Sequence, residues 1–296
     1  MPNTLAHIGV NSLITKRVIP KTNIFWIYLG CVISDFPWIF KKIIYLIFPT
    51  VNGYNLHAYS IVQASLFFSL LLSLSVSFLS KSFKTTFFTL FLGSLLHLLL
   101  DPLQIKWANG VHFFAPFHWE LTYFGFFLPE HFITYLLTLL GFIVFIYNWK
   151  EISKSKEIFS LKAKNIFLSL FTFSLYATLP FFLYTSAIKA DNHFLGTLTS
   201  KTRKDKYIEM DRKNVVFDKN TNSFWIESFN KELIELSGIK NIKSNRISIK
   251  GKFKTNNLIY VTDYTENWAF FRDGSSYLGL SLILFCFIVI IKNTFS

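Results

Sequence analysis

Long runs of apolar residues, separated by short polar connections, cover most of this chain. The runs long enough to cross a bilayer as helices are 58–80, 85–103, 129–148, 165–188 and 276–291. Two shorter apolar segments, 4–14 and 24–36, are joined by TKRVIPKTN, in which Pro20 interrupts the helical pattern. The pattern predicts a mainly α-helical, polytopic membrane bundle that begins with a helical hairpin.

Residues 189–275 follow a different pattern, because they are polar and carry 16 Lys and Arg against 11 Asp and Glu. The runs NVVFD, SFWIES, RISIKGKF and NLIYVTDY place β-forming residues between turn residues, as short strands do. We therefore predict three parts. They are a helical membrane domain at 1–188, a small β-rich soluble domain at 189–275, and a last transmembrane helix at 276–296.

The composition agrees with a membrane protein, since 52% of the residues are hydrophobic and only 16% are charged. The formal charge of +13 does not lead us to expect nucleic-acid binding, because Lys and Arg form short clusters between apolar runs. Cys31 and Cys286 both lie in apolar segments, so the sequence predicts neither a disulfide framework nor a thiolate metal site.

The basic clusters also predict how the chain is oriented. The connection from Lys81 to Lys84 and the loop 149–164 are short and basic, so both should face the cytoplasm. The loop 104–128 and the β-rich domain then lie on the far side of a cytoplasmic (inner) membrane. Basic residues follow the first apolar stretch and do not precede it, so we expect no cleaved signal peptide.

Five ionisable residues within or beside these segments are predicted to lie at a similar depth in the membrane. They are His7, Asp35, His57, His97 and Asp101. At about 1.5 Å per residue, His7, Asp35 and His97 each lie roughly 14–20 Å above their own basic turns. In a helix, His97 and Asp101 share one face, with Cβ atoms about 6 Å apart. Separate segments therefore bring polar groups to a similar depth.

An ionisable group inside a membrane segment needs a partner, and these apolar runs offer no basic residue to balance both aspartates. A divalent cation held by imidazole and carboxylate would provide that balance, and zinc, or manganese or iron with more oxygen ligands, suits these donors. The alternative is a purely structural network. In it, His97 bonds a backbone carbonyl and Asp101 caps the helix end before Pro102.

Four short motifs lie within about residues 1–150: TLAH, ISDFPW, LHAYS and LLHLLLDPLQIKWANGVHFFAPF. Together they resemble the LexA-binding, inner-membrane-associated hydrolases, which are also described as membrane-bound metal-dependent hydrolases. The resemblance implies hydrolysis, and it implies metal binding by His7, Asp35, His57, His97 and Asp101. Around His57 the sequence departs from the family, which often has two histidines before the serine.

The leading hypothesis is a metal-dependent hydrolase that uses activated water against an ester or phosphoester of a membrane lipid or lipid-linked substrate. Asp35 or Glu130 is the candidate general base. Further candidates for the metal shell or for headgroup binding are His112, His118 and His131 on the predicted outer side.

Two other classes of function remain open. The buried His and Asp residues could form a proton or cation pathway of a transporter, although they gather at one end of the helices. Alternatively, the helices could anchor the β-rich domain, which would bind a partner protein or a polymer.

Overall fold

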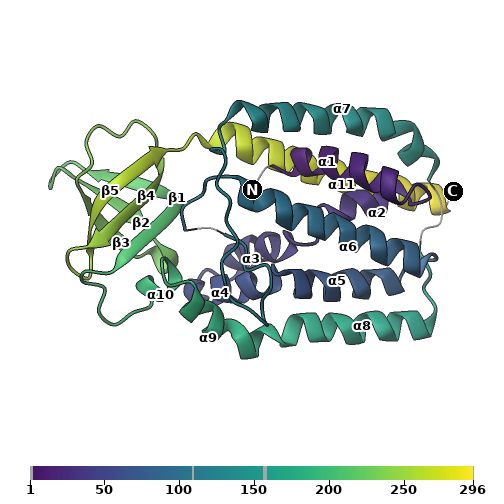
Figure 1. Cartoon of the computed structure of the whole chain (residues 1–296), viewed down its shortest axis with the longest axis horizontal. Helices are drawn as coiled ribbons and strands as arrows, with labels where there is room; N and C mark the ends of the chain where they lie inside the picture. Colours follow the sequence, from purple (N-terminus) through teal and green to yellow (C-terminus); the bar gives the residue numbers. More distant parts are fainter. Residues whose placement is uncertain (1–2, 109, 156–158, 296) are drawn as a thin grey trace.

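A computed structural model describes residues 3–108, 110–155 and 159–295 (Figure 1). The chain is mostly helical and carries a small five-stranded β-barrel at one end of the helical bundle. This confirms the predicted mainly α-helical class and the presence of a small β-rich unit. The long helices run side by side, and α11 returns from the barrel into the bundle (Figure 1).

The elements of the bundle follow one another along the chain with short connections. They are α1 (Thr4–Val18), α2 (Ile24–Gly30), α3 (Phe36–Ile47), α4 (Gly53–Gln63), α5 (Leu66–Phe78), α6 (Phe83–Leu100), the 3-10 turn η1 (Asp101–Leu103), α7 (Phe132–Lys154), α8 (Ala163–Thr178), α9 (Pro180–Ala190), α10 (Leu195–Leu198) and α11 (Ala269–Phe295).

Among the described residues, four helical segments are long and apolar enough to cross a membrane. They are Phe83–Leu103, Phe132–Lys154, Ala163–Ala190 and Phe271–Asn293. Large apolar side chains on the outer faces of these helices are exposed, including Ile143 on α7, Phe167 on α8 and Ile288 on α11. A soluble monomer rarely exposes so many apolar residues together.

The prediction of one helix over 58–80 is wrong, because this segment lies in two helices, α4 and α5, with a bend of 73° between them. Ser65 is extended at the start of α5, and the amide of Leu66 donates to the carbonyl of Phe113. The loop after α6 thus takes over a hydrogen bond that a continuous helix would have made within itself.

Close backbone contacts at glycines fix the first helices in the bundle. A Cβ atom at Gly141 of α7 would lie 1.8 Å from the carbonyl oxygen of Leu5 in α1, and one at Gly93 of α6 would lie 2.8 Å from the backbone of Gly30. Small residues allow helices to approach this closely. Asn3 adds a 2.6 Å hydrogen bond to Thr138 of α7. These contacts hold α1 against α7, and α2 against α6.

The segment 24–36 is not one helix either. Helix α2 ends at Gly30, turns occupy 31–35, and Asp35 stands at the N-cap of α3. The amide of Cys31 still bonds the carbonyl of Ile27, so the chain turns directly out of α2. Asp35 therefore lies on a turn between two helices.

The barrel is built from β1 (Tyr207–Asp218), β2 (Ser223–Glu227), β3 (Leu233–Ser237), β4 (Arg246–Phe253) and β5 (Leu258–Glu266), with the turn η2 (Phe229–Lys231) after β2. The strand order is β1-β2-β3-β5-β4, closed by pairing of β1 with β4, and β3 and β5 are parallel. This is the connectivity of the five-stranded Greek-key barrel called the OB-fold. Its interior is filled by Ile208, Met210, Ile226, Ile234, Ile247, Ile249 and Ile259.

The four predicted strand runs all lie in strands, whereas β3 and the first half of β1 were not predicted. Strands occupy 207–266, which lies inside the predicted 189–275. The chain reaches the barrel through α9 and α10, and leaves it through α11, whose first turns precede the predicted span.

Polar contacts join the barrel to the end of the bundle. The amide of Ala108 donates to Glu209 at 2.9 Å, and the amide of Gly53 donates to the side chain of Asn230 at 2.7 Å. Glu130, just before α7, forms an ion pair with Arg212 of β1. The barrel is thus docked on the end of the bundle where α1 begins and α6 ends (Figure 1).

Candidate metal centre

Four of the five predicted metal ligands come together where the bundle meets the barrel. His7 comes from the second turn of α1, His97 from the last turn of α6, Asp101 from the start of η1, and Asp35 from the turn before α3. We call these four residues the His–Asp cluster. Both histidines are fully or almost fully buried, and Asp35 is the most exposed member at 18%.

The nitrogen and oxygen atoms of the cluster converge on one region. His7 Nε2 lies 3.4 Å from Asp101 Oδ1, and His97 Nε2 lies 3.6 Å from Asp101 Oδ2 and 3.5 Å from Asp35 Oδ1. One ligand atom from each of His7, His97 and Asp101 lies within 4.8 Å of the other two. Among the described residues, this is the group of three that could hold a metal ion.

The hydrogen bond of His97 determines which of its ring nitrogens is free. Nδ1 lies 2.6 Å from the backbone carbonyl of Cys31, and a carbonyl can only accept, so Nδ1 donates its proton. In the neutral ring, Nε2 then carries a lone pair, which faces the carboxylates of Asp35 and Asp101. Metal-binding histidines are oriented by this kind of carbonyl contact. The predicted bond from His97 to a backbone carbonyl is confirmed, and it leaves Nε2 available.

The ring of His7 makes fewer hydrogen bonds than that of His97. Neither of its ring nitrogens has a hydrogen-bond partner, although the side chain is fully buried. Its ring stacks on that of His97 with centroids 3.9 Å apart and an angle of 9°. Two charged imidazoliums would repel each other in this arrangement. The stack therefore favours at least one neutral ring with a free lone pair.

The carboxylates also keep free oxygens. Asp35 occupies an N-cap position, yet its side chain makes no capping hydrogen bond, and its Oδ1 has no hydrogen-bond partner. Asp101 Oδ1 likewise has none. Buried polar atoms are usually paired, because leaving one unpaired costs about 1–3 kcal/mol. The unpaired oxygens of Asp35 and Asp101 are therefore free to accept a cation or a proton donor.

The spacing of these atoms fits a divalent metal ion. Ligands bound to zinc at about 2.0–2.2 Å in tetrahedral geometry lie roughly 3.3–3.6 Å from one another. The distances of 3.4, 3.5 and 3.6 Å within the cluster fall in this range and are too long for strong hydrogen bonds. The donors, two imidazoles with carboxylate oxygens, are those that zinc, manganese and iron accept. The residues present therefore fit a metal site.

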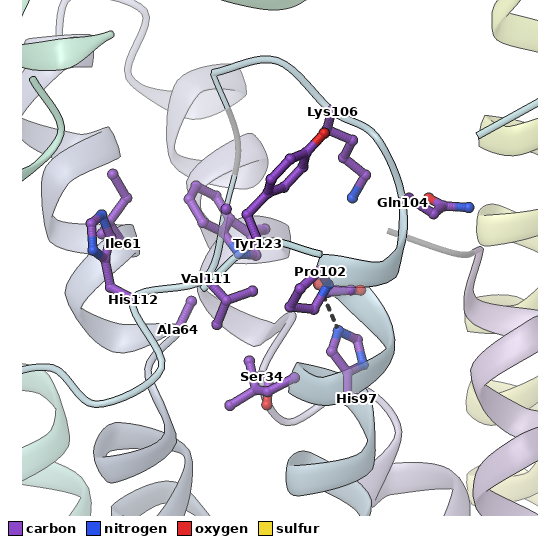
Figure 2. A pocket seen from close by; sticks show the side chains of 14 residues that line it. Ser34, Ile61, Ala64, His97, Pro102, Gln104, Lys106, Val111, His112 and Tyr123 are labelled. Carbon is purple, nitrogen blue, oxygen red and sulfur yellow. Dashed lines mark ion pairs between the residues drawn. The ribbon is translucent and has the colours of Figure 1, made fainter. Parts of the chain in front are cut away.

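Two cavities approach the His–Asp cluster from different sides. The first is lined by His97 and Asp101 together with the loop residues Lys106, His112 and Tyr123. Figure 2 shows this cavity, with the contact between His97 Nε2 and Asp101 Oδ2 dashed. The second cavity, between α3 and α11, is lined by Asp35, Trp38 and His57, among others. The cluster therefore borders cavities at the end of the bundle that faces the barrel.

His57, the fifth predicted ligand, is not brought into the His–Asp cluster. Its Nδ1 contacts the ammonium of Lys41 in α3, and its ring packs near Trp38, Phe194 and Phe229. An ammonium group only donates, so Nδ1 of His57 is the acceptor. The helical bend after α4 and the turn before α3 together place His57 beside a lysine instead of beside the two aspartates.

Glu130, the alternative general base, is engaged elsewhere. Its ion pair with Arg212 joins the loop before α7 to the barrel, and it lines a separate small pocket with Asp211 and Ser248. His131 caps α7, since its Nδ1 accepts from the amide of Ile133 at 3.3 Å. Both residues thus have structural partners, Glu130 in the barrel and His131 in α7.

The two loop histidines differ from each other. His118 is exposed and lies 3.8 Å from Glu120, as a solvated side chain would. His112 is buried, lies 3.0 Å from the carbonyl of Trp119, and burial lowers its pKa below the ordinary value. It faces the same cavity as Asp101, so of the loop histidines it is the one near the His–Asp cluster.

Some features of this region were not predicted. The carbonyl of Cys31, which orients His97, leaves no sequence signal because it is a backbone group. Lys41, which contacts His57, could have been noticed, because FKKII places two lysines in an otherwise apolar segment.

Comparisons of this chain with protein-family models, with curated proteins and with solved structures found no match.

Proposed function

We propose that this chain is a polytopic membrane protein that binds a divalent metal ion at His7, His97 and Asp101 and hydrolyses an ester or phosphoester of a membrane lipid. The observation that carries the proposal is the convergence of unpartnered, buried imidazole nitrogens and carboxylate oxygens at metal-like spacing. The resemblance of the motifs to membrane-bound metal-dependent hydrolases supports the same conclusion.

The membrane location is supported by the helices. Four segments have the length and composition of membrane spans, and their outward side chains are apolar and exposed. Basic residues between the spans favour a cytoplasmic membrane with the His–Asp cluster and the barrel on the extracytoplasmic side. A substrate would then reach the cluster from the outer leaflet.

The chemistry follows from the residues. A divalent ion held by this donor set, with zinc as the first choice, would polarise the scissile group and lower the pKa of water. Asp35 is the best placed general base, because its free Oδ1 points toward His97 and its side chain is the most accessible of the four. It would take the proton of the attacking water.

The test is the metal content of the purified protein, measured by mass spectrometry after removal of loosely bound ions. Wild type should carry near-stoichiometric zinc, manganese or iron. The double variant His97→Ala, Asp101→Ala should lose it, because two of the three converging ligands are gone. The matched control His118→Ala removes an exposed histidine and should retain the metal.

A folded double variant with as much metal as wild type would contradict the proposed site. Wild-type protein that binds no metal, even when zinc, manganese and iron are offered during purification, would contradict the hydrolase altogether.

A transport function is a second candidate, favoured by a line of buried polar residues on α1. His7, Asn11 and Thr15 are four residues apart and fully buried, and the side-chain atoms of Asn11 and Thr15 have no hydrogen-bond partner. Such a stripe leads from the His–Asp cluster toward the other end of the bundle, as a proton or cation pathway would.

The variant Asn11→Leu, Thr15→Val would separate the two functions. In proteoliposomes with a pH-sensitive dye inside, a transporter should lose its proton or cation flux when the stripe becomes apolar. A hydrolase should keep its metal and its activity. No flux in wild-type vesicles would remove transport from consideration.

A further inference from the structure

A second polar cluster lies beside the His–Asp cluster and has the opposite charge. Lys41 of α3, His57 of α4 and Lys213 of β1 form this basic cluster around the ring of Phe229. The ammonium groups of Lys41 and Lys213 lie 5.0 and 4.2 Å from the centroid of that ring, and the His57 ring centroid lies 5.0 Å from it. All three side chains are half-buried between the bundle and the barrel.

The positive charge of the basic cluster has no close acidic partner. Among the described residues, no carboxylate lies within 4.0 Å of Lys41 or Lys213, and their contacts are with His57 and aromatic rings. Asp211 and Glu227 act on Lys213 only at longer range. Burying two ammonium groups side by side costs free energy unless an anion joins them.

The donors of the basic cluster are free to bind such an anion. Nδ1 of His57 accepts from Lys41, so the proton of the neutral ring is on Nε2, where it can be donated. Each lysine keeps further N–H donors, and neither offers an acceptor. Three donor groups without acceptors suit a phosphate, which has several acceptor oxygens and negative charge.

One cavity lies next to both clusters, because one residue of each cluster lines it. This cavity, between α3 and α11, is lined by Asp35 and His57 together with Trp38, Lys42 and Arg272. The exposed side of the same α3 is apolar at Phe40, Leu46 and Ile47, as in a helix that lies at a lipid surface. A molecule in this cavity would contact Asp35 and His57, one residue of each cluster.

We infer that Lys41, His57 and Lys213 bind the phosphate group of the substrate, so that the substrate is a phosphate ester carried on a membrane lipid. The inference rests on the proposed hydrolase and narrows its substrate class. It also gives the barrel a role, since Lys213 is the barrel's contribution to the site. A β-bulge between Met210 and Lys213 interrupts the pairing of β1 with β4 just before this residue, and bulges redirect side chains.

The test is lipid binding by the full chain in detergent, measured by titration calorimetry with a chelator present so that no turnover occurs. The probes are dioctanoyl phosphatidic acid, inorganic phosphate, and dioctanoylglycerol, which has the same chains without the phosphate. The variant Lys41→Gln, Lys213→Gln should weaken binding of phosphatidic acid by roughly tenfold or more, because charge-assisted hydrogen bonds are among the strongest. The diacylglycerol should not bind.

The matched control is Lys252→Gln, Lys254→Gln, which removes two exposed barrel lysines, one of which also lies over an aromatic ring. It should change the affinity less than about twofold, because exposed charges contribute little. If the double variant of the basic cluster does not fold, Lys213→Gln alone should weaken binding, and Lys213→Arg should preserve it.

If the double lysine variant binds only phosphatidic acid more weakly than wild type does, the basic cluster recognises a lipid phosphate. If it also binds inorganic phosphate more weakly, the phosphate group alone is enough for recognition. Equal affinities of wild type and the double variant, or an equal loss in the control, would overturn the inference. The metal content of the lysine variants should match wild type. If the lysine variants bind phosphatidic acid like wild type, the result of the metal-content measurement still stands. If wild type is purified without metal but binds phosphatidic acid, only the proposed hydrolase activity is contradicted.

Discussion

The His–Asp cluster and the basic cluster lie at the same end of the bundle, and each contributes one residue, Asp35 or His57, to the cavity between α3 and α11. Their free atoms are nevertheless opposite in kind. The His–Asp cluster presents unpartnered acceptors: Asp35 Oδ1, Asp101 Oδ1 and His97 Nε2. The basic cluster presents donors on Lys41, Lys213 and His57, with no carboxylate at ion-pair distance among the described residues. Each cluster lacks the charge that the other has in excess.

The two clusters are suited to ligands of opposite charge. If they only balanced each other, lysine and aspartate would be in direct contact, as Arg212 and Glu130 are. Instead Lys41 contacts a histidine and aromatic rings, and Asp35 faces His97. A cation in the first cluster and an anionic group in the second would complete both. A metal-bound phosphate ester would supply the pair.

The largest change in the rate of hydrolysis is expected when the general base is replaced, and this distinguishes the two candidates, Asp35 and Glu130. Asp35→Asn should lower the hydrolysis of bis(para-nitrophenyl) phosphate by roughly 10²–10⁴-fold, the usual contribution of a general base, while the metal stays bound. Glu130→Gln should change the rate only several-fold, because Glu130 serves the barrel contact. The assay follows release of para-nitrophenol by purified protein in detergent.

The opposite ranking, with Glu130→Gln the slower enzyme, would place the base outside the His–Asp cluster. Loss of metal from Asp35→Asn would instead make Asp35 a ligand.

A smaller effect is expected from disturbing the packing beneath the His–Asp cluster. In Gly141→Ala the new methyl group would meet the carbonyl oxygen of Leu5 at 1.8 Å, so α1 and α7 must separate. Overpacking of this kind costs about 1–3 kcal/mol. We expect a lower Tm in detergent and weaker metal binding, since His7 follows Leu5 on α1. The basic cluster should bind phosphatidic acid as before.

The control for this variant is Gly274→Ala on α11, where an added methyl group meets nothing within 4 Å. Its Tm and metal content should equal or exceed those of wild type. Equal behaviour of the two alanine variants would show that the close approach of α1 and α7 is not needed for the site.

The smallest expected effect is a proton uptake at the basic cluster. Burial lowers the pKa of Lys213 from 10.5 to about 8, although Asp211 and Glu227 oppose the shift. Burial also lowers the pKa of Lys41 well below its ordinary value. At pH 8, Lys213 beside Lys41 and His57 is charged in about half of the molecules, and a bound anion favours the charged form. Binding of phosphatidic acid should therefore take up protons and weaken as the pH rises above 8.

Titration calorimetry at pH 8 in two buffers of different ionisation enthalpy measures this uptake, which Lys213→Gln should reduce. Binding that releases protons, or that strengthens between pH 8 and 9.5, would contradict the assignment of phosphate to the basic cluster.

Much of the architecture could be predicted from the sequence, because it depends on local patterns. Apolar runs and basic loops predicted most of the long helices, and alternating runs predicted four of the five strands. Spacing within one helix paired His97 with Asp101. What failed were the bends, since the break after α4 depends on a hydrogen bond from Leu66 to Phe113 in a distant loop.

Local sequence is enough to select candidates for a metal site, because histidine and aspartate in apolar helices reach one height by their count of residues from each turn. Which of them meet depends on tertiary packing, through which His7 stacks on His97, Asp35 joins them and His57 turns to Lys41. Those outcomes depend on close glycine contacts, on the end of α2 at Gly30, and on a barrel strand that brings Lys213 beside the helices. None of these is a property of one segment, since each arises where two distant segments pack together.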